Sequence, residues 1–200
     1  FSLESTLTLP TEFNAMRASA VDAANGLVYF AAGNALARVH AASLSVATAA
    51  VRSPSEFPAT ALAVDGAGFA YFGGGQTITK VRLSDFTEVG RINHPGLFPQ
   101  TIESLAVDAG NNAGYAGTYG SPAVVLKFRL SPLEWVDAAG TKPPESWLSS
   151  VVLDTATQKA FFTDFGARAG VVKINLAVPA AAPAVPGGSV VSLATSRTLR

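Results

Sequence analysis

An internal repeat constrains this sequence more than any other feature. Four segments share an apolar pair, an aspartate and, a few residues later, an aromatic residue. The aspartates are Asp22, Asp65, Asp108 and Asp154, separated by 43, 43 and 46 residues. A basic residue next to a β-branched or aromatic one follows each aspartate by 16, 15, 19 and 19 residues. These basic residues are Arg38, Lys80, Lys127 and Lys173. Self-similarity at this period indicates a repeat architecture.

The second copy shows what each repeat builds. Leu62–Val64 is a short apolar strand, and the segment 65–68, Asp-Gly-Ala-Gly, is a turn. Phe69–Phe72 is a second strand, and two alternating apolar and polar stretches follow, Ile78–Leu83 and Thr87–Ile92. Four short antiparallel strands in about 43 residues are typical of a β-propeller blade. Because the sequence shows no amphipathic helix of ten or more residues, a solenoid of helix pairs is excluded.

The predicted fold class is therefore all-β, with about four four-stranded antiparallel blades that form part of a larger propeller or assembly. The repeat divides the chain into five parts. These are 1–19 (the outer strand of a preceding blade and its connection), 20–61, 62–104, 105–149 and 150–200, the last with a Pro/Ala-rich segment at 177–188. Phe1–Leu9 matches the outer strand of a blade, like Phe86–Ile92, and Ser189–Leu193 is a predicted final strand.

Two ways of completing the structure stay open. The blades belong to a propeller of six to eight blades, or else four blades close alone or two chains close together. We favour the larger propeller or assembly, because a ring of four blades is rare and open sheet edges invite association. The chain starts at Phe1 without Met or a signal peptide, which fits a mature product or a part of a longer protein.

The repeats resemble the YVTN and NHL-type propeller families. The resemblance lies in three stretches, "LAVDGAGFAYF", "SLAVDAGNNAGYAGT" and "ITKVRLSDFTEVGRI". It implies that the apolar-Asp-turn-aromatic segment forms the two inner strands of each blade. The resemblance covers nearly the whole chain, and its motifs are specific for the fold but indicate almost nothing about function.

Composition excludes several classes of chemistry. Lys+Arg and Asp+Glu number 14 each, so no basic surface argues for a nucleic-acid partner. The chain has no cysteine, which removes disulfides, thiolate zinc sites and thiol nucleophiles. No apolar stretch approaches the roughly 20 residues of a membrane-spanning helix.

Several candidate functional residues also have a structural explanation. Asp22, Asp65, Asp108 and Asp154 could form a ring of carboxylates that binds a cation, but turn capping is favoured because each lies beside turn-forming residues. His40 and His94 show no metal-ligand spacing. Gly73–Gly75 lacks the Lys-Ser/Thr of a phosphate loop, so we expect it to form a loop or bulge between strands. We therefore expect no catalytic residue, no metal and no cofactor, and a protein that is not an enzyme.

Two further sets of residues have both a functional and a structural interpretation. The four basic residues at equivalent repeat positions could form a stripe for anionic sugars or acidic partners, or could simply be the outward half of strand alternation, which is favoured. Trp135 and Trp147, placed in the connection between the third and fourth repeats, could contact a glycan or an interface, or could pack internally.

These observations favour a non-enzymatic structural and interaction module of a secreted or cell-surface protein, with an extracellular filament or coat as one setting. Its partners would be other protein chains or further blades of the same protein. The alternatives are a carbohydrate-binding propeller, and an enzyme that uses the central channel of the propeller.

Overall fold

The computed structural model describes residues 2–14, 16–33, 35–49, 59–94, 100–141, 146–166 and 169–176. Its strands form small antiparallel sheets in chain order. The first contains β1 (Met16–Asp22), β2 (Leu27–Ala32), β3 (Ala35–His40) and β4 (Ser45–Ala49). The second contains β5 (Ala61–Val64), β6 (Phe69–Gly74), β7 (Thr77–Arg82) and β8 (Glu88–Asn93). The third contains β9 (Thr101–Asp108), β10 (Ala113–Tyr119), β11 (Val124–Leu130) and β12 (Leu133–Gly140). The fourth contains β13 (Leu148–Asp154), β14 (Lys159–Asp164) and β15 (Gly170–Asn175).

Each sheet is an up-and-down meander in which every strand pairs with the next one along the chain. The register repeats as well, because the basic residue of the third strand lies opposite the aromatic residue of the second. The pairs are Tyr29–Arg38, Tyr71–Lys80, Tyr115–Lys127 and Phe161–Lys173. The predicted all-β fold is confirmed. Three repeats contain the four expected strands, and the fourth repeat has three strands within the described residues. Each sheet starts a few residues before the repeat boundary that the aspartates suggested.

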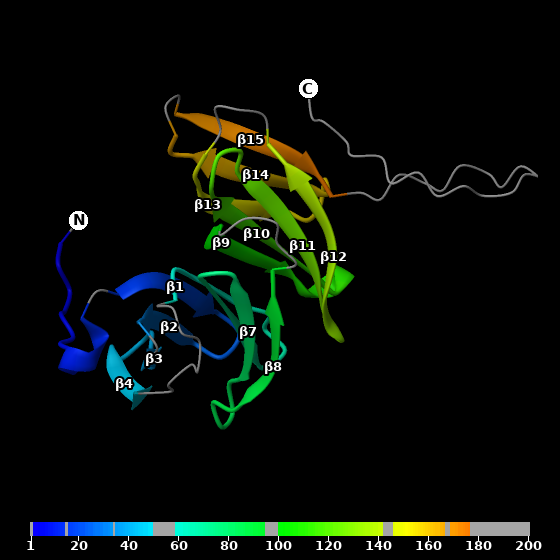
Figure 1. Ribbon diagram of the computed structural model, residues 1–200. Helices are drawn as coiled ribbons and strands as arrows, with labels where there is room; N and C mark the ends of the chain where they lie inside the picture. Colours follow the sequence, from blue (N-terminus) through cyan, green and yellow to red (C-terminus); the bar gives the residue numbers. More distant parts are fainter. Residues whose placement is uncertain are drawn as a thin grey trace, which may run out of the picture.

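The sheets follow one another around an arc (Figure 1). Their first strands β1, β5, β9 and β13 lie on the inner side and pack against each other in chain order. Three apolar clusters fill the spaces between consecutive sheets, and they contain the fully buried side chains of Tyr29, Tyr71, Phe128 and Phe162. This arrangement of small sheets, face to face around an axis, is that of four β-propeller blades.

The arc stays open between its ends. Within the part of the chain described here, no strand of the first sheet packs extensively against the fourth. The segment Ser2–Pro10, which includes most of the predicted outer strand, makes no strand pairing with the other described residues. The other expected strand, Ser189–Leu193, and the Pro/Ala-rich segment 177–188 lie outside the described residues. None of the described helices is long and apolar enough to cross a membrane.

Close contact between neighbouring blades depends on glycine. Gly73 and Gly74, expected in a loop or bulge, lie inside β6 instead. A Cβ atom on Gly73 would come within 2.6 Å of the Ile102 side chain and within 3.3 Å of Ala61. A side chain here would therefore separate the second and third sheets. Only Gly75, with φ of +53°, lies in the turn that follows the strand.

Candidate functional site

The four repeated aspartates lie in the turn between the first two strands of each sheet. The Asp65 carboxylate accepts hydrogen bonds from the amides of Ala67 (2.8 Å) and Phe69 (3.0 Å). Asp22 and Asp108 each accept bonds from the backbone and side chain of an asparagine three residues later, and Asp154 does the same with Thr157. These bonds cap the turns. Among the described residues, no three acidic, histidine or cysteine side chains converge on a possible metal site.

The basic residues do not form an outward stripe. Arg38 and Lys80 lie between consecutive sheets, where each reaches a backbone carbonyl of the next one: Arg38 donates to Leu83 (3.3 Å) and Lys80 to Leu130 (2.8 Å). The ammonium of Lys80 also lies 4.1 Å from the ring centre of Phe69. The expectation that this position is simply the outward half of strand alternation is therefore wrong for these two residues, because the neighbouring sheet covers the face on which they lie.

The equivalent residues of the last two repeats are Lys127 and Lys173. Lys127 lies 5.7 Å from the ring centre of Tyr115, and both line a cavity of about 400 Å³ between the third and fourth sheets. Lys173 lies 5.6 Å from the ring centre of Phe161, but it is exposed. A contact between the cation and a ring of its own sheet thus recurs at Lys80, Lys127 and Lys173, whereas burial of the cation depends on a following blade.

Trp135 lies within β12, the outer strand of the third sheet, and not in a connection between repeats as the sequence suggested. Its indole N–H donates to the carbonyl of Asn93 at the end of β8. Its ring makes edge contacts with Phe128 (5.9 Å) and His94 (6.0 Å). Trp135 therefore joins the outer strands of two blades, and burial lowers the pKa of His94 beside it.

Trp147 has a different environment. Its ring meets Tyr119 and Phe165 edge-on, with centroids 5.4 and 5.2 Å apart. Tyr119 and Phe165 are 53% and 69% exposed. We call these three residues the aromatic ledge. They lie where the loops between second and third strands of the third and fourth blades meet the start of β13. Exposed aromatic side chains grouped in this way are typical of interaction surfaces.

A buried carboxylate holds the ledge in place. Asp164, at the end of β14, is 5% exposed and accepts hydrogen bonds from the amides of Gly166 (2.9 Å), Ser146 (3.3 Å) and Trp147 (3.3 Å). The amide of Phe165 in turn donates to the carbonyl of Trp147 (2.8 Å). Two chain segments that carry ledge residues are therefore fixed by one side chain, which limits their freedom before any partner binds.

Glu103 of β9 lies beside the ledge, close enough to interact with the indole of Trp147. Partial burial raises the pKa of its carboxyl group, while Arg17 of β1 and the indole oppose that shift. The candidate site therefore combines exposed rings with a half-buried acid at one end of the blades.

Sequence reasoning singled out Trp147 but not Tyr119, Phe165, Asp164 or Glu103. Alignment of the repeats could have identified Tyr119 and Phe165. Tyr119 and Phe165 occupy one repeat position, at the end of the second strand or directly after it, where the first two repeats have Gly33 and Gly75. Asp164 and Glu103 carry no such signal, because their roles depend on contacts across loops and blades.

No protein-family model matches the chain, and no curated protein sequence matches it either. Solved structures do. The chain is similar to the hydrazine synthase of Kuenenia stuttgartiensis (TM-score 0.68, 13% identity, 87% of this chain and 49% of that one). It is also similar to a chain of a nidogen/laminin complex (TM-score 0.64, 12% identity, 80% and 61%) and to the WD40 repeats of RRP9 (TM-score 0.60, 10% identity, 74% and 44%).

The chain is a β-propeller module. It spans between about two fifths and three fifths of these structures' chains. At such low identity the likeness concerns the fold alone. The finer resemblance to YVTN and NHL-type repeats stays a prediction from the sequence.

Proposed function

We propose that this propeller is a non-enzymatic protein-interaction module that binds a partner protein through the aromatic ledge. The observation that carries the proposal is the exposure of Tyr119 and Phe165 around Trp147. Asp164 holds the two segments that carry Trp147 and Phe165 in one conformation. Aromatic side chains fixed before binding give large contact area at low entropic cost.

The wider setting belongs to the same proposal. Two of the similar structures are the WD40 repeats of RRP9 and a chain of a nidogen/laminin complex, which fits a module that binds proteins. As expected from the sequence, we propose a secreted or cell-surface protein, with a filament or coat as one assembly. Fractionation of cells that express the tagged chain checks this part.

The experiment compares three forms of the tagged chain as bait in native extracts, with quantitative mass spectrometry of the captured proteins. The ledge variant is Trp147→Ala with Phe165→Ala, and the matched control is Val136→Ala, another exposed apolar side chain outside the ledge. A protein retained by the wild type and the control, but reduced at least about tenfold by the ledge variant, supports the proposal. Circular dichroism confirms that all three are folded.

A carbohydrate partner is the second candidate, because exposed rings can stack on sugars. The candidate glycan site then consists of Trp147 and its two neighbours, since Trp135 is engaged between blades. Binding on a glycan array that disappears with Trp147→Ala, together with no ledge-dependent protein capture, would replace the protein-partner proposal with this one.

A further inference from the structure

The fourth sheet exposes the face that points away from the third sheet. In the other three sheets the equivalent face is buried against the next sheet. The residue two positions before the basic residue of the third strand shows this directly. Leu36, Ile78 and Val125 are 1%, 0% and 4% exposed, whereas Val171 in the fourth sheet is 67% exposed. In the first three sheets the next blade covers this position, so the apolar side chain at Val171 marks a face built for a further blade.

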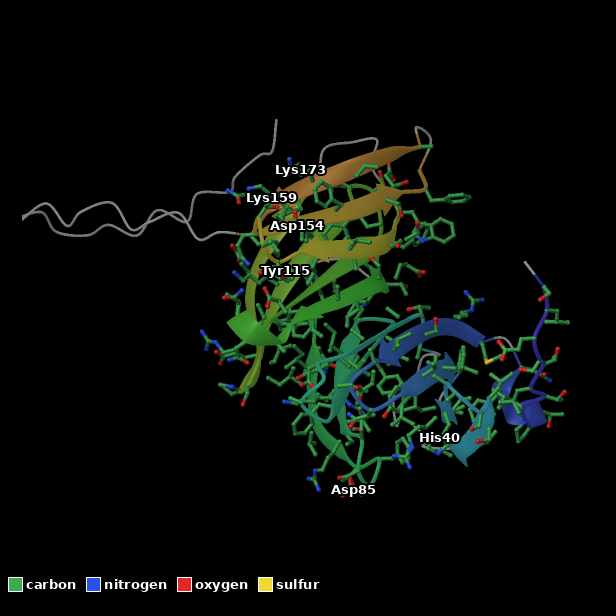
Figure 2. The ribbon with its side chains drawn as sticks, turned by 180° about the vertical axis from the view of Figure 1, so that it is seen from behind. His40, Asp85, Tyr115, Asp154, Lys159 and Lys173 are labelled. Carbon is green, nitrogen blue, oxygen red and sulfur yellow. The ribbon has the colours of Figure 1, made fainter. Side chains whose placement is uncertain are left out.

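Other residues on the same face agree. Val152 lies opposite Phe161, which lies opposite Lys173, so the three form one row across the sheet. Val152 is 65% exposed. In the second sheet the corresponding lysine donates to a carbonyl of the next blade. Figure 2 shows Lys173 on the side of the fourth sheet that faces away from Tyr115 and the third sheet.

The fourth sheet also has a free edge. β3, β7 and β11 each pair with a fourth strand, but β15 pairs only with β14 among the described residues. An unpaired strand edge offers a row of backbone donors and acceptors to another strand.

The N-terminal segment has the pattern of that missing outer strand. Phe1 precedes Phe13 by twelve residues, as Phe86 precedes Phe98 in the second repeat. By this alignment, residues 3–8 correspond to β8, so Leu7 takes the place of Ile92 and Leu3 takes the place of Glu88. Leu3 is 84% exposed, and within the described part of the chain the segment makes no strand pairing.

The first sheet has a backbone carbonyl at the position that accepts from the basic residue in the internal contacts between sheets. Ala41 corresponds to Leu83 and Leu130, because its amide bonds to Gly26 (2.9 Å) as theirs bond to Gly68 (2.8 Å) and Asn112 (3.2 Å). Ala41 is exposed. The free face of the first sheet also has exposed apolar residues, Val21 (64%) and Val46 (40%).

We propose that a second copy of this chain docks head to tail on the fourth blade, adding its segment Ser2–Leu9 to the edge of β15 and its first sheet to the open face. The joint repeats the internal contact between the second and third blades, with Lys173 donating to the Ala41 carbonyl of the other copy. Because this contact joins two different surfaces, it closes into a ring where the rotation allows and extends where it does not.

The repeat sets the register of the exchanged strand. In the second sheet Ile78 lies opposite Ile92, and Thr79 lies opposite Arg91. The corresponding pairs in the joint are Val171 with Leu7 and Val172 with Thr6. The more exposed valine of β15 is thereby covered by a leucine that has no strand partner among the described residues of its own chain.

Sedimentation velocity of the 200-residue chain tests the joint. The wild type is expected to form species of at least twice the 20.5 kDa chain mass as concentration rises to about 100 μM. Val171→Asp and Leu3→Asp, on the two sides of the joint, should each weaken association at least about tenfold. Both positions are exposed in the single chain, so both variants should fold. Val89→Asp, an exposed valine on β8 outside the joint, is the matched control and should associate normally.

Cysteine cross-linking tests the register, since the chain has no cysteine of its own. Chains with Thr6→Cys and chains with Val172→Cys are mixed and oxidised, and a disulfide-linked pair is expected because opposed strand residues lie within disulfide reach. Thr6→Cys mixed with Thr163→Cys, one strand further from the edge, should give little product.

The outcomes separate the possible occupants. A chain that stays monomeric at about 100 μM and whose mixed cysteine variants stay unlinked overturns the proposal, and leaves the edge to other strands such as Ser189–Leu193. Association that Val171→Asp and Leu3→Asp do not weaken also overturns it. Ledge variants should associate like the wild type, so the two proposals can fail separately.

Discussion

Lysines at one repeat position have different surroundings in this propeller. Lys80 donates to the Leu130 carbonyl and lies over Phe69, while Lys173 contacts only the Phe161 ring among the residues that the structure describes. Lys80→Met should therefore lower the free energy of unfolding by about 1–2 kcal/mol, since it leaves a carbonyl without its donor and removes a cation–π contact. Lys173→Met should change it by less than about 0.5 kcal/mol. Urea denaturation at concentrations where the chain is monomeric measures both, and equal losses would contradict this role of the following blade.

Glu103 should make stability depend on pH. Because burial raises its pKa in the folded protein above the ordinary value of 4.5, folding favours the protonated form. Its contribution is greatest below that value and is lost as pH rises through the folded-state pKa. The melting temperature of Glu103→Gln should fall less between pH 4.5 and pH 7 than that of the wild type. Asp137→Asn, at an exposed carboxyl on β12, should keep the wild-type slope; a Glu103→Gln slope equal to it would contradict the burial effect.

At the scale of strands, β10 has room for no side chain at Gly114. A Cβ atom there would lie 2.1 Å from the ring of Phe128, which is fully buried and packed against Tyr71 and Trp135. Gly114→Ala should therefore lower the free energy of unfolding by about 2–3 kcal/mol. Gly140→Ala in β12, where nothing lies within 4 Å, should be neutral or slightly stabilising. Thermal unfolding of the two variants compares them, and equal melting temperatures would contradict the close packing of β10 and β11.

The strands could be predicted from the sequence because their pattern is local. Asp65 and the glycines after it define a turn, and alternation in Ile78–Leu83 defines a half-buried strand. The surroundings of Lys80 and Trp135 could not be predicted in the same way. The face of a strand that a side chain occupies follows from alternation, but whether another blade covers that face is a property of the whole arc.

The candidate site depends even more on long-range contacts. Trp147 was a candidate from the sequence because tryptophan is a rare residue type, but its neighbours Tyr119 and Phe165 come from different repeats. Their shared repeat position was visible in the sequence, whereas the hydrogen bonds of Asp164 that hold the loops were not. Repeat alignment therefore predicts which positions become equivalent, and the coordinates show which equivalent positions stay exposed.

At the scale of the whole molecule, the blades form a chain of nearest neighbours. The second and third sheets pack against a sheet on both sides, whereas the first and fourth do so on one side only within the described part of the arc. In repeat structures of this kind, stability is approximately a sum of each unit and its contacts with adjacent units. Opening of the end blades should therefore require less free energy than opening of the middle ones.

Hydrogen exchange can show this gradient and connect it to the docking of a second copy. In dilute protein, amides of β6 and β10 should exchange slowest, and those of β14 and β15 at least about tenfold faster, because one face of the fourth sheet is uncovered. At a concentration where the wild type associates, exchange should slow in β15 and in residues 2–9 together, since both gain partners in the same joint. With Val171→Asp the two segments should stay at their dilute rates. Uniform protection across the sheets would show that the arc opens as one unit, and slowing confined to one of the two segments would separate the strand edge from the N-terminal segment.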